Sequence, residues 1–114
     1  MVKQGDIIKI DFSPTSGNEQ SGYRPAVVVS NEVVIERSGV VLVCPVTNTT
    51  KRTFLNVLLD DQTQTQGAVL CGQTRAIDLK SRPYRIIESL SDEKLKEVLR
   101  TIAKMLEQSE GVGI

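Results

Sequence analysis

The chain has 114 residues, with fourteen basic and fourteen acidic side chains, two cysteines and no histidine. This length suits one domain around one core, and the zero formal charge means that a polyanionic partner must meet a local cluster of basic residues rather than the field of the whole molecule. The lack of histidine excludes Ser-His-Asp and Cys-His catalysis and, together with the lack of a CxxC pair, makes a zinc site unexpected.

The N-terminal part predicts two strands joined by a long loop. From residue 5 to residue 12, apolar side chains alternate with charged ones at the period of a half-buried strand. Residues 13–23 are rich in Ser, Gly, Pro and Asn and predict a loop, and loops of this length in compact domains are usually functional or mobile. A second strand, from Arg24 to Ser30, is apolar on both faces, which indicates a central position in the sheet.

The middle of the chain alternates apolar runs with polar loops. A strand at 40–47 contains Pro45 and is followed by a polar loop at 48–53. A fourth strand at 54–60 is followed by a second polar loop at 61–67.

The C-terminal part predicts a bent strand, a short strand and a helix. The apolar stretch 67–79 is interrupted by Gly72, where a bulge or bend would let one strand serve two sheets. A short strand follows at 84–90, and Ser91 is placed as the N-cap of a helix with acidic residues at its positive end. The apolar face of this helix comprises Leu95, Val98, Leu99, Ile102, Ala103 and Leu106. The final GVGI is expected to fray.

These elements predict a fold that is mainly β with a C-terminal α-helix. We expect five to seven short strands around one core, arranged as a small, partly open β-barrel, with residues 1–114 as a single domain. Cys44 and Cys71 stand in apolar contexts, which predicts buried free thiols. No apolar run approaches the roughly 20 residues that span a bilayer, and no apolar leader begins the chain, so a reduced, cytoplasmic setting is expected.

Among the residues that could carry out chemistry, Arg24 is the first candidate for binding a phosphate. A residue before a proline is held extended, so Gly22 and Pro25 would fix the direction of Arg24 at the start of its strand. A guanidinium group donates two parallel hydrogen bonds to a phosphate and stays charged at any working pH. A surface ion pair between Arg24 and Glu19 is the structural alternative.

Other polar side chains follow apolar strands in the same way. Thr47 follows the run VLVCPV, and Gln73 and Arg75 follow AVLC. If these strand ends meet in space, they form a shallow groove of hydrogen-bond donors with Glu19 near its rim. Taken singly, each of them is also explained by a loop or a bent strand.

The motifs around these residues resemble the MazF/PemK family of toxin endoribonucleases. The resemblance runs through GDIIKIDFSPTSGNEQSGYRPAVVVS, VCPVT, GAVLCGQTRAIDL and the terminal SDEKLKEVLRTIAKML, in that order. It implies an SH3-like barrel that forms a homodimer and cleaves single-stranded RNA, including mRNA, without a cofactor or metal, leaving 2′,3′-cyclic phosphate and 5′-hydroxyl ends. It also implies inhibition by a small antitoxin protein, operator DNA as a partner only of the toxin–antitoxin complex, and no membrane partner.

The resemblance also assigns roles to single residues. Arg24 corresponds to the arginine of the RP motif, Thr47 to the threonine that closes the PVT strand, and Glu19 to the glutamate of the EQ pair, so these are the candidate catalytic residues. The candidates for RNA contact are Asn18, Gln20, Tyr23, Lys51, Arg52, Gln73 and Arg75. For Tyr23, Gln73 and Arg75 a packing role is an open alternative.

The chain departs from one branch of this family at the proton-transfer residues. In that branch an arginine and an aspartate flank the cysteine of an RCDQ stretch, and a histidine precedes the EQ pair. Here those positions hold Leu70, Gly72 and Asn18. The general base and acid are therefore open, with Glu19 as a candidate base.

Two other functions are compatible with the same fold. One is a toxin without nuclease activity that binds a protein target such as DNA gyrase, although the tryptophan near the end of the gyrase poison has no counterpart in this chain. The other is a catalytically silent module that only binds a partner. The preferred RNA sequence and the identity of the antitoxin are not legible in the sequence.

Overall fold

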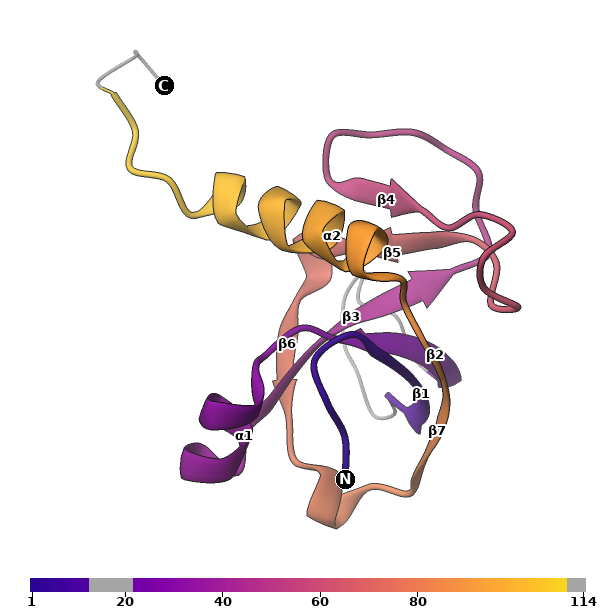
Figure 1. Cartoon of the computed structure of the whole chain (residues 1–114), viewed down its shortest axis with the longest axis vertical. Helices are drawn as coiled ribbons and strands as arrows, with labels where there is room; N and C mark the ends of the chain where they lie inside the picture. The colour runs from indigo at the N-terminus through magenta and orange to yellow at the C-terminus, as the bar shows by residue number, and fades with distance from the viewer. Residues whose placement is uncertain (13–21, 111–114) are drawn as a thin grey trace.

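The computed structural model describes residues 1–12 and 22–110, which form seven strands, two α-helices and two short 3-10 turns (Figure 1). The strands are β1 (Asp6–Asp11), β2 (Tyr23–Val28), β3 (Val41–Thr47), β4 (Asn56–Leu58), β5 (Ala68–Leu70), β6 (Arg75–Ile77) and β7 (Tyr84–Ser89). The helices are α1 (Glu32–Ser38) and α2 (Asp92–Met105), and the 3-10 turns are η1 (Cys71–Gln73) and η2 (Leu79–Ser81). The expected mainly β fold with a C-terminal helix is confirmed.

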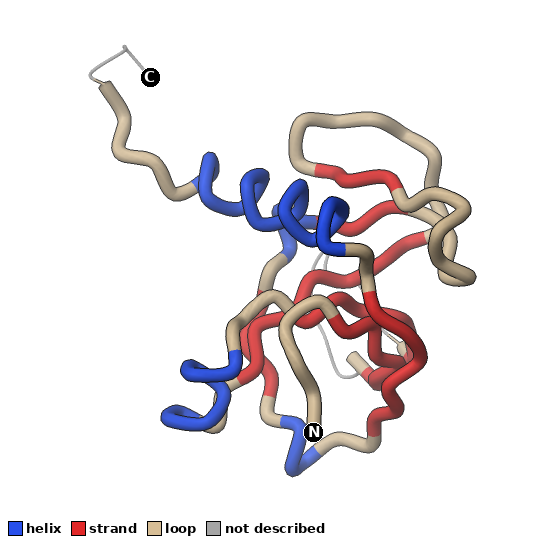
Figure 2. Tube along the Cα trace, in the orientation of Figure 1, coloured by secondary structure: helices blue, strands red, loops and turns tan. Residues whose placement is uncertain are grey.

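All strand pairs are antiparallel and form one strongly curved sheet (Figure 2). The strand order is β4-β5-β3-β2-β1-β7, and β6 pairs with β3 beside this path. Within the described residues the end strands β4 and β7 do not pair with each other, so the sheet is not closed. The partly open form and the central position of β2 are as predicted.

The apolar stretch 67–79 does serve two parts of the sheet. Its first half is β5, which pairs with β4 and with the end of β3, and its second half is β6, which pairs with the start of β3. The break between them is η1, a turn of 3-10 helix that contains Gly72, rather than a bulge. The fourth strand is shorter than predicted, because only Asn56–Leu58 pairs.

The core has two layers, one on each face of the sheet. One hydrophobic cluster, which includes Ile7, Val27 and Cys44, lies between the sheet and α2. The other, which includes Ile8, Ile10 and Phe12, fills the opposite side. Ile7, an apolar residue that does not follow the alternation of the first strand, is fully buried because α2 covers that face of the sheet.

Helix α2 begins as predicted. The Ser91 hydroxyl accepts a hydrogen bond from Lys94 N at 3.1 Å, which satisfies one free amide of the first turn. Val98 is fully buried and Leu95, Leu99 and Ile102 pack against the core. The prediction fails in the last turn, where Ala103 is exposed and Leu106 is 79% exposed, because the helix extends past the sheet there (Figure 1).

Helix α1 was not predicted. Asn31 caps its start by accepting a hydrogen bond from Val34 N at 3.0 Å, and Gly39 ends it with φ of +73°. Only the side chain of Ile35 packs against the core, so the helix has no apolar periodicity. The capping pair Asn31 and Gly39 was the available signal.

Two further expectations concern cysteine and membranes. Cys44 and Cys71 are buried free thiols, as predicted. In the described parts of the chain, no helix has the length and apolar character needed to cross a bilayer.

Asp6 fixes the entry into β1, and its replacement should destabilise the fold. Its carboxylate is 97% removed from solvent contact, accepts Lys3 N at 2.8 Å and accepts the Ser89 hydroxyl at 2.9 Å. Asp6→Ala should lower the free energy of unfolding by about 2–3 kcal/mol, because a buried charged acceptor and the two hydrogen bonds that it accepts are lost. Urea unfolding would measure this, with the exposed Asp61→Ala as control; equal losses in both variants would contradict the role given to Asp6.

Candidate functional site

Arg24 lies near the start of β2 and is half-buried. Gly22, before it, has φ of +86°, and its carbonyl accepts a hydrogen bond from Phe12 N at 2.9 Å, so the chain enters β2 through a conformation that favours glycine. Arg24 is the Cα partner of Ile10 in the β1–β2 ladder, so the two side chains share a face of the sheet. This face is the one opposite α2.

Thr47, the last residue of β3, belongs to the same edge. In the β2–β3 ladder Ala26 pairs with Pro45. Two residues further along this register, Arg24 lies opposite Thr47, on the same face. The predicted meeting of these two strand ends is therefore what the strand register favours.

Arg75 brings a second guanidinium group to this side of the sheet. It begins β6 as the Cα partner of Val43, and its guanidinium carbon lies 5.3 Å from the centroid of the Phe12 ring, a cation–π distance. Val43 and Phe12 belong to the same cluster as Ile10, the partner of Arg24. Gln73 is half-buried at the end of η1, two residues before Arg75.

The structure separates other candidates from this group. Tyr23 is 54% exposed and pairs with Asp11, so strand alternation places it on the opposite face from Arg24. Lys51 and Arg52 are exposed on the loop between β3 and β4. Positions 18–20 (Asn18, Glu19 and Gln20) lie outside the described residues, so their predicted roles stay predictions.

Lys9 of β1, which was not singled out from the sequence, lies opposite the basic Arg85 of β7. Lys9 is the Cα partner of Arg85, and like charges directly opposite each other destabilise a sheet unless an anion or solvent compensates them. The pair lies on the same face as Asp11 and Tyr23. No sequence signal connects the two, because they meet only through the β1–β7 register.

The loop between β4 and β5 closes on Thr47. Gly67 ends this loop with φ of +116°, and a β-carbon built on it would lie 2.0 Å from the Thr47 carbonyl oxygen. Its own carbonyl accepts a hydrogen bond from Leu59 N at 2.9 Å. The position of Thr47 therefore depends on a glycine twenty residues away in the chain.

Glu88 of β7 holds the same loop from the other side. Its carboxylate accepts Gln64 N at 3.1 Å, Thr65 N at 2.8 Å and the Thr65 hydroxyl at 2.7 Å. Burial alone would raise the pKa of Glu88, but the hydrogen bonds from Thr65 and Gln64 outweigh it and hold this pKa below the ordinary value of 4.5.

Glu88 should make stability depend on pH. Because its pKa is lower in the folded state, its contribution is present above the unfolded-state pKa and is lost as the pH falls through the folded-state value. Wild-type protein should therefore lose stability below about pH 4.5 more steeply than Glu88→Gln. Urea unfolding at a series of pH values would measure this, with the exposed Glu93→Gln as control. A slope that Glu88→Gln leaves unchanged would contradict the expectation.

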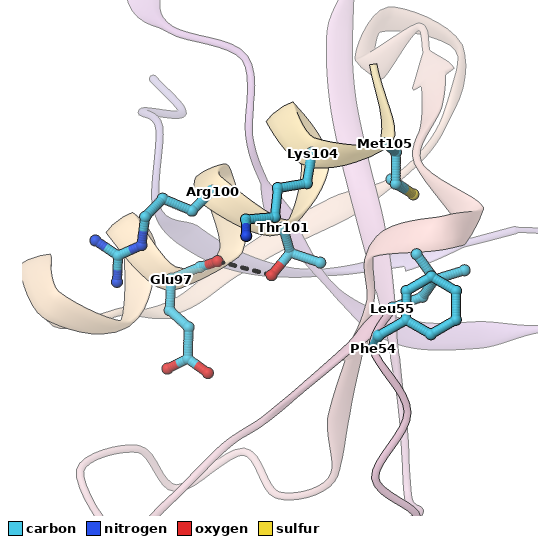
Figure 3. Close-up of a pocket in the computed structure, with 7 residues that line it drawn as sticks. All are labelled: Phe54, Leu55, Glu97, Arg100, Thr101, Lys104 and Met105. Atoms are coloured by element: carbon cyan, nitrogen blue, oxygen red, sulfur yellow. Dashed lines mark hydrogen bonds between the residues drawn. The ribbon is translucent and has the colours of Figure 1, made fainter. Parts of the chain in front are cut away.

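A groove of about 420 Å³ lies at the other side of the molecule, beside α2 (Figure 3). Its lining comprises Phe54, Leu55, Glu97, Arg100, Thr101, Lys104 and Met105. Phe54 is 90% exposed, which is unusual for so large an apolar side chain. Neither Arg24 nor Thr47 is among the described residues that line this groove, so we treat it as a surface for a protein partner rather than a reaction site.

The described residues also bear on metals. Across residues 1–12 and 22–110, no three His, Cys, Asp or Glu side chains gather as they would to hold a metal ion. The donors that this part of the site does present are arginine and hydroxyl groups, which suit a phosphate.

Comparisons with known proteins identify relatives of this chain. Residues 3–106 match the family model of the PemK-like, MazF-like toxins of type II toxin–antitoxin systems. The endoribonuclease toxin MazF of Escherichia coli (strain K12) is 38% identical over 78 residues, which are 68% of this chain and 69% of that protein. MazF (Form-I) from Deinococcus radiodurans has a TM-score of 0.84 at 30% identity, covering 92% of this chain and 96% of that one. MazE-MazF (Form-II) from the same organism gives 0.80 at 30% identity, covering 95% and 97%.

Proposed function

The chain belongs to the PemK-like, MazF-like toxins of type II toxin–antitoxin systems, and from this premise we propose that it is an endoribonuclease that cleaves single-stranded RNA. The observation that carries the proposal is the register that brings Arg24 opposite Thr47, with Arg75 on the same side of the sheet. Two guanidinium groups and a hydroxyl on one side suit the phosphates of a nucleic acid.

The proposed reaction is attack of a ribose 2′-oxygen on the adjacent phosphorus. The bond from phosphorus to the 5′-oxygen of the next nucleotide breaks, which leaves a 2′,3′-cyclic phosphate and a 5′-hydroxyl. Negative charge grows on the non-bridging oxygens, where Arg24 and the Thr47 hydroxyl stabilise it by donating hydrogen bonds. Glu19 takes the 2′-proton, and Gln73 and Arg75 contact neighbouring nucleotides.

The remaining RNA contacts extend from this centre. Asn18 and Gln20 lie beside Glu19 in the chain, and Lys51 and Arg52 follow Thr47 on an exposed loop, so both groups supply positive or polar contacts along the strand. The enzyme acts where its mRNA substrate is, in the cytoplasm. Operator DNA is a partner of the toxin–antitoxin complex and not of the toxin alone.

The test is cleavage of a long single-stranded RNA by the purified protein in EDTA. We expect cuts at defined sites, mapped by primer extension, with cyclic phosphate ends detected by mass spectrometry. Cleavage that EDTA abolishes would contradict the mechanism. A supercoiling assay that detects gyrase inhibition without RNA cleavage would instead support a toxin that binds a protein target.

The groove beside α2 supports the homodimer. Phe54 and Met105 offer apolar surface, and α2 carries Glu97 on the same side as Arg100 and Lys104 (Figure 3). Around a two-fold axis such a face is self-complementary, because the acidic residue of one copy meets the basic residues of the other. Sedimentation should give a dimer for the wild type and a monomer for Phe54→Asp, with the exposed Gln62→Asp as control. A monomeric wild type would contradict this interface.

The antitoxin is a second protein partner in this proposal. One structural relative is MazF bound to MazE. We expect a small antitoxin to cover the Arg24 side of the sheet and so to block RNA access, which competition between antitoxin and RNA would detect.

A further inference from the structure

Cys44 and Cys71 are fully buried free thiols on facing segments of the chain. In the β3–β5 ladder Val46 pairs with Val69, and two residues further along this register Cys44 of β3 lies opposite Cys71, the first residue of η1. Antiparallel partners have Cα atoms about 4.5–5.5 Å apart, which falls within the roughly 4.4–6.8 Å that a disulfide spans. The continued register therefore places the two cysteines opposite each other, within the span of a disulfide.

Each thiol also influences the ionisation of the other. The Thr74 hydroxyl lies 3.1 Å from the Cys44 sulfur, and the Cys71 thiol donates to the Val69 carbonyl at 3.9 Å. The neighbouring Cys71 thiol holds the pKa of Cys44 below its ordinary value of 9.0 in spite of burial, whereas the neighbouring Cys44 and burial raise the pKa of Cys71. The pair therefore favours a thiolate at Cys44, the form in which a cysteine reacts.

Cys71 is in contact with a residue that lines the groove beside α2. Leu55 lines this groove (Figure 3), and its carbonyl accepts a hydrogen bond from Cys71 N at 3.1 Å. Gly72, the next residue, is exposed and packs under Leu55, whose Cδ1 would lie 3.1 Å from a β-carbon at this position. Glu97 lines the groove too and its charge acts on Cys71. Leu55 therefore links the groove directly to Cys71 and Gly72.

We propose that Cys44 and Cys71 form a redox modification site, in which a small peroxide converts the two thiols to an intramolecular disulfide. The Cys44 thiolate attacks one peroxide oxygen, the O–O bond breaks, and a sulfenic acid forms with release of hydroxide. The Cys71 sulfur then attacks the Cys44 sulfur, the S–O bond breaks, and the oxygen leaves as water with the proton of Cys71. With hydrogen peroxide, two thiols and one peroxide give one disulfide and two waters.

The disulfide would connect β3 to η1. Thr47 lies three residues beyond Cys44 on β3, and Thr74 and Arg75 directly follow η1. The Thr74 hydroxyl fixes this turn by donating to the Cys71 carbonyl at 2.7 Å and by its contact with the Cys44 sulfur. Oxidation replaces that second contact and draws the sulfur atoms to about 2.05 Å. This part of the inference rests on the proposed function: the shifted turn carries Gln73 and Arg75, so oxidation should lower RNA cleavage.

The site itself is tested without RNA. Reduced full-length protein is treated with hydrogen peroxide, unfolded in urea with N-ethylmaleimide, and weighed by intact-mass spectrometry. We expect the bridged chain to carry no maleimide, to lose two hydrogens and to gain about 4 °C or more in melting temperature, reversed by dithiothreitol. Cys44→Ser and Cys71→Ser should show none of these changes. Two maleimides per wild-type chain after peroxide, sulfinic acid in place of the bridge, or a bridge between chains would overturn the proposal.

A cleavage assay tests the regulatory part separately. Peroxide-treated wild type should lose activity that dithiothreitol restores, whereas Cys44→Ser should keep its activity under the same treatment. Full activity in the bridged protein would refute the regulatory part. If neither form cleaves RNA, the proposed function fails, while the mass and melting results still decide whether the site exists.

Discussion

Replacing Arg24 by alanine is expected to lower the rate of RNA cleavage by roughly a hundred- to a thousand-fold, because one preorganised donor to the developing charge is worth about 2.7–4 kcal/mol. The backbone provides the preorganisation that this free energy requires. Gly22 and Pro25 hold Arg24 extended, and the register places it opposite Thr47. The loss should fall on kcat rather than on RNA affinity, because the interaction strengthens only in the transition state. Single-turnover cleavage in EDTA would separate the two.

Two matched variants make this test specific. Arg24→Lys keeps the charge but loses the paired donors, so it should retain part of the activity. Thr47→Val removes the hydroxyl at nearly constant shape, and the double variant Arg24→Ala/Thr47→Val should lose less than the product of the single effects, because both residues act on one phosphate. Circular dichroism would show that the variants fold. Wild-type rates in Arg24→Ala, or fully multiplicative losses, would contradict a shared catalytic centre.

The sequence predicted those features of the fold that depend on local pattern. The apolar run that begins at Arg24 and Pro25 predicted a central strand, and the N-cap residue Ser91 predicted the start of α2. Both signals depend on only a few neighbouring residues. Burial of Ile7 could not be predicted in this way. It depends on α2, which begins more than eighty residues later and covers the second face of β1. The exposed Leu106 shows the converse, because helical spacing does not say where the sheet beneath a helix ends.

The candidate site also contains residues that local pattern predicts and residues that only the strand register reveals. Arg24, Thr47 and Arg75 could be predicted as site residues because each begins or ends an apolar strand. Antiparallel pairing of these strands then brings them to one side of the sheet. Tyr23 was predicted to contact RNA because it is adjacent to Arg24 in the sequence. Adjacent residues of a strand point to opposite faces, so the two side chains are separated by the sheet. Lys9 was missed because its pairing with Arg85 exists only in the β1–β7 register.

Gly67→Ala is expected to lower stability more than alanine at any other glycine that the structure describes. The new β-carbon would lie 2.0 Å from the Thr47 carbonyl oxygen and 2.8 Å from its carbonyl carbon, so backbone rather than a flexible side chain must move. Alanine at φ of +116° is strained as well. Together, overpacking and backbone strain should lower the free energy of unfolding by about 3–5 kcal/mol, a large part of the stability of a domain of this size.

Gly39→Ala separates the two causes. Gly39 also has positive φ, +73°, but a β-carbon there meets nothing within 4 Å, so its replacement should cost about 1 kcal/mol through backbone conformation alone. Urea unfolding of both variants measures the difference, which isolates the clash with Thr47. Because that clash displaces the residue opposite Arg24, Gly67→Ala should also lose cleavage at temperatures where it is still folded, whereas Gly39→Ala should cleave normally. Equal stability losses in the two variants would show that the loop between β4 and β5 yields easily, and Thr47 would then not depend on Gly67.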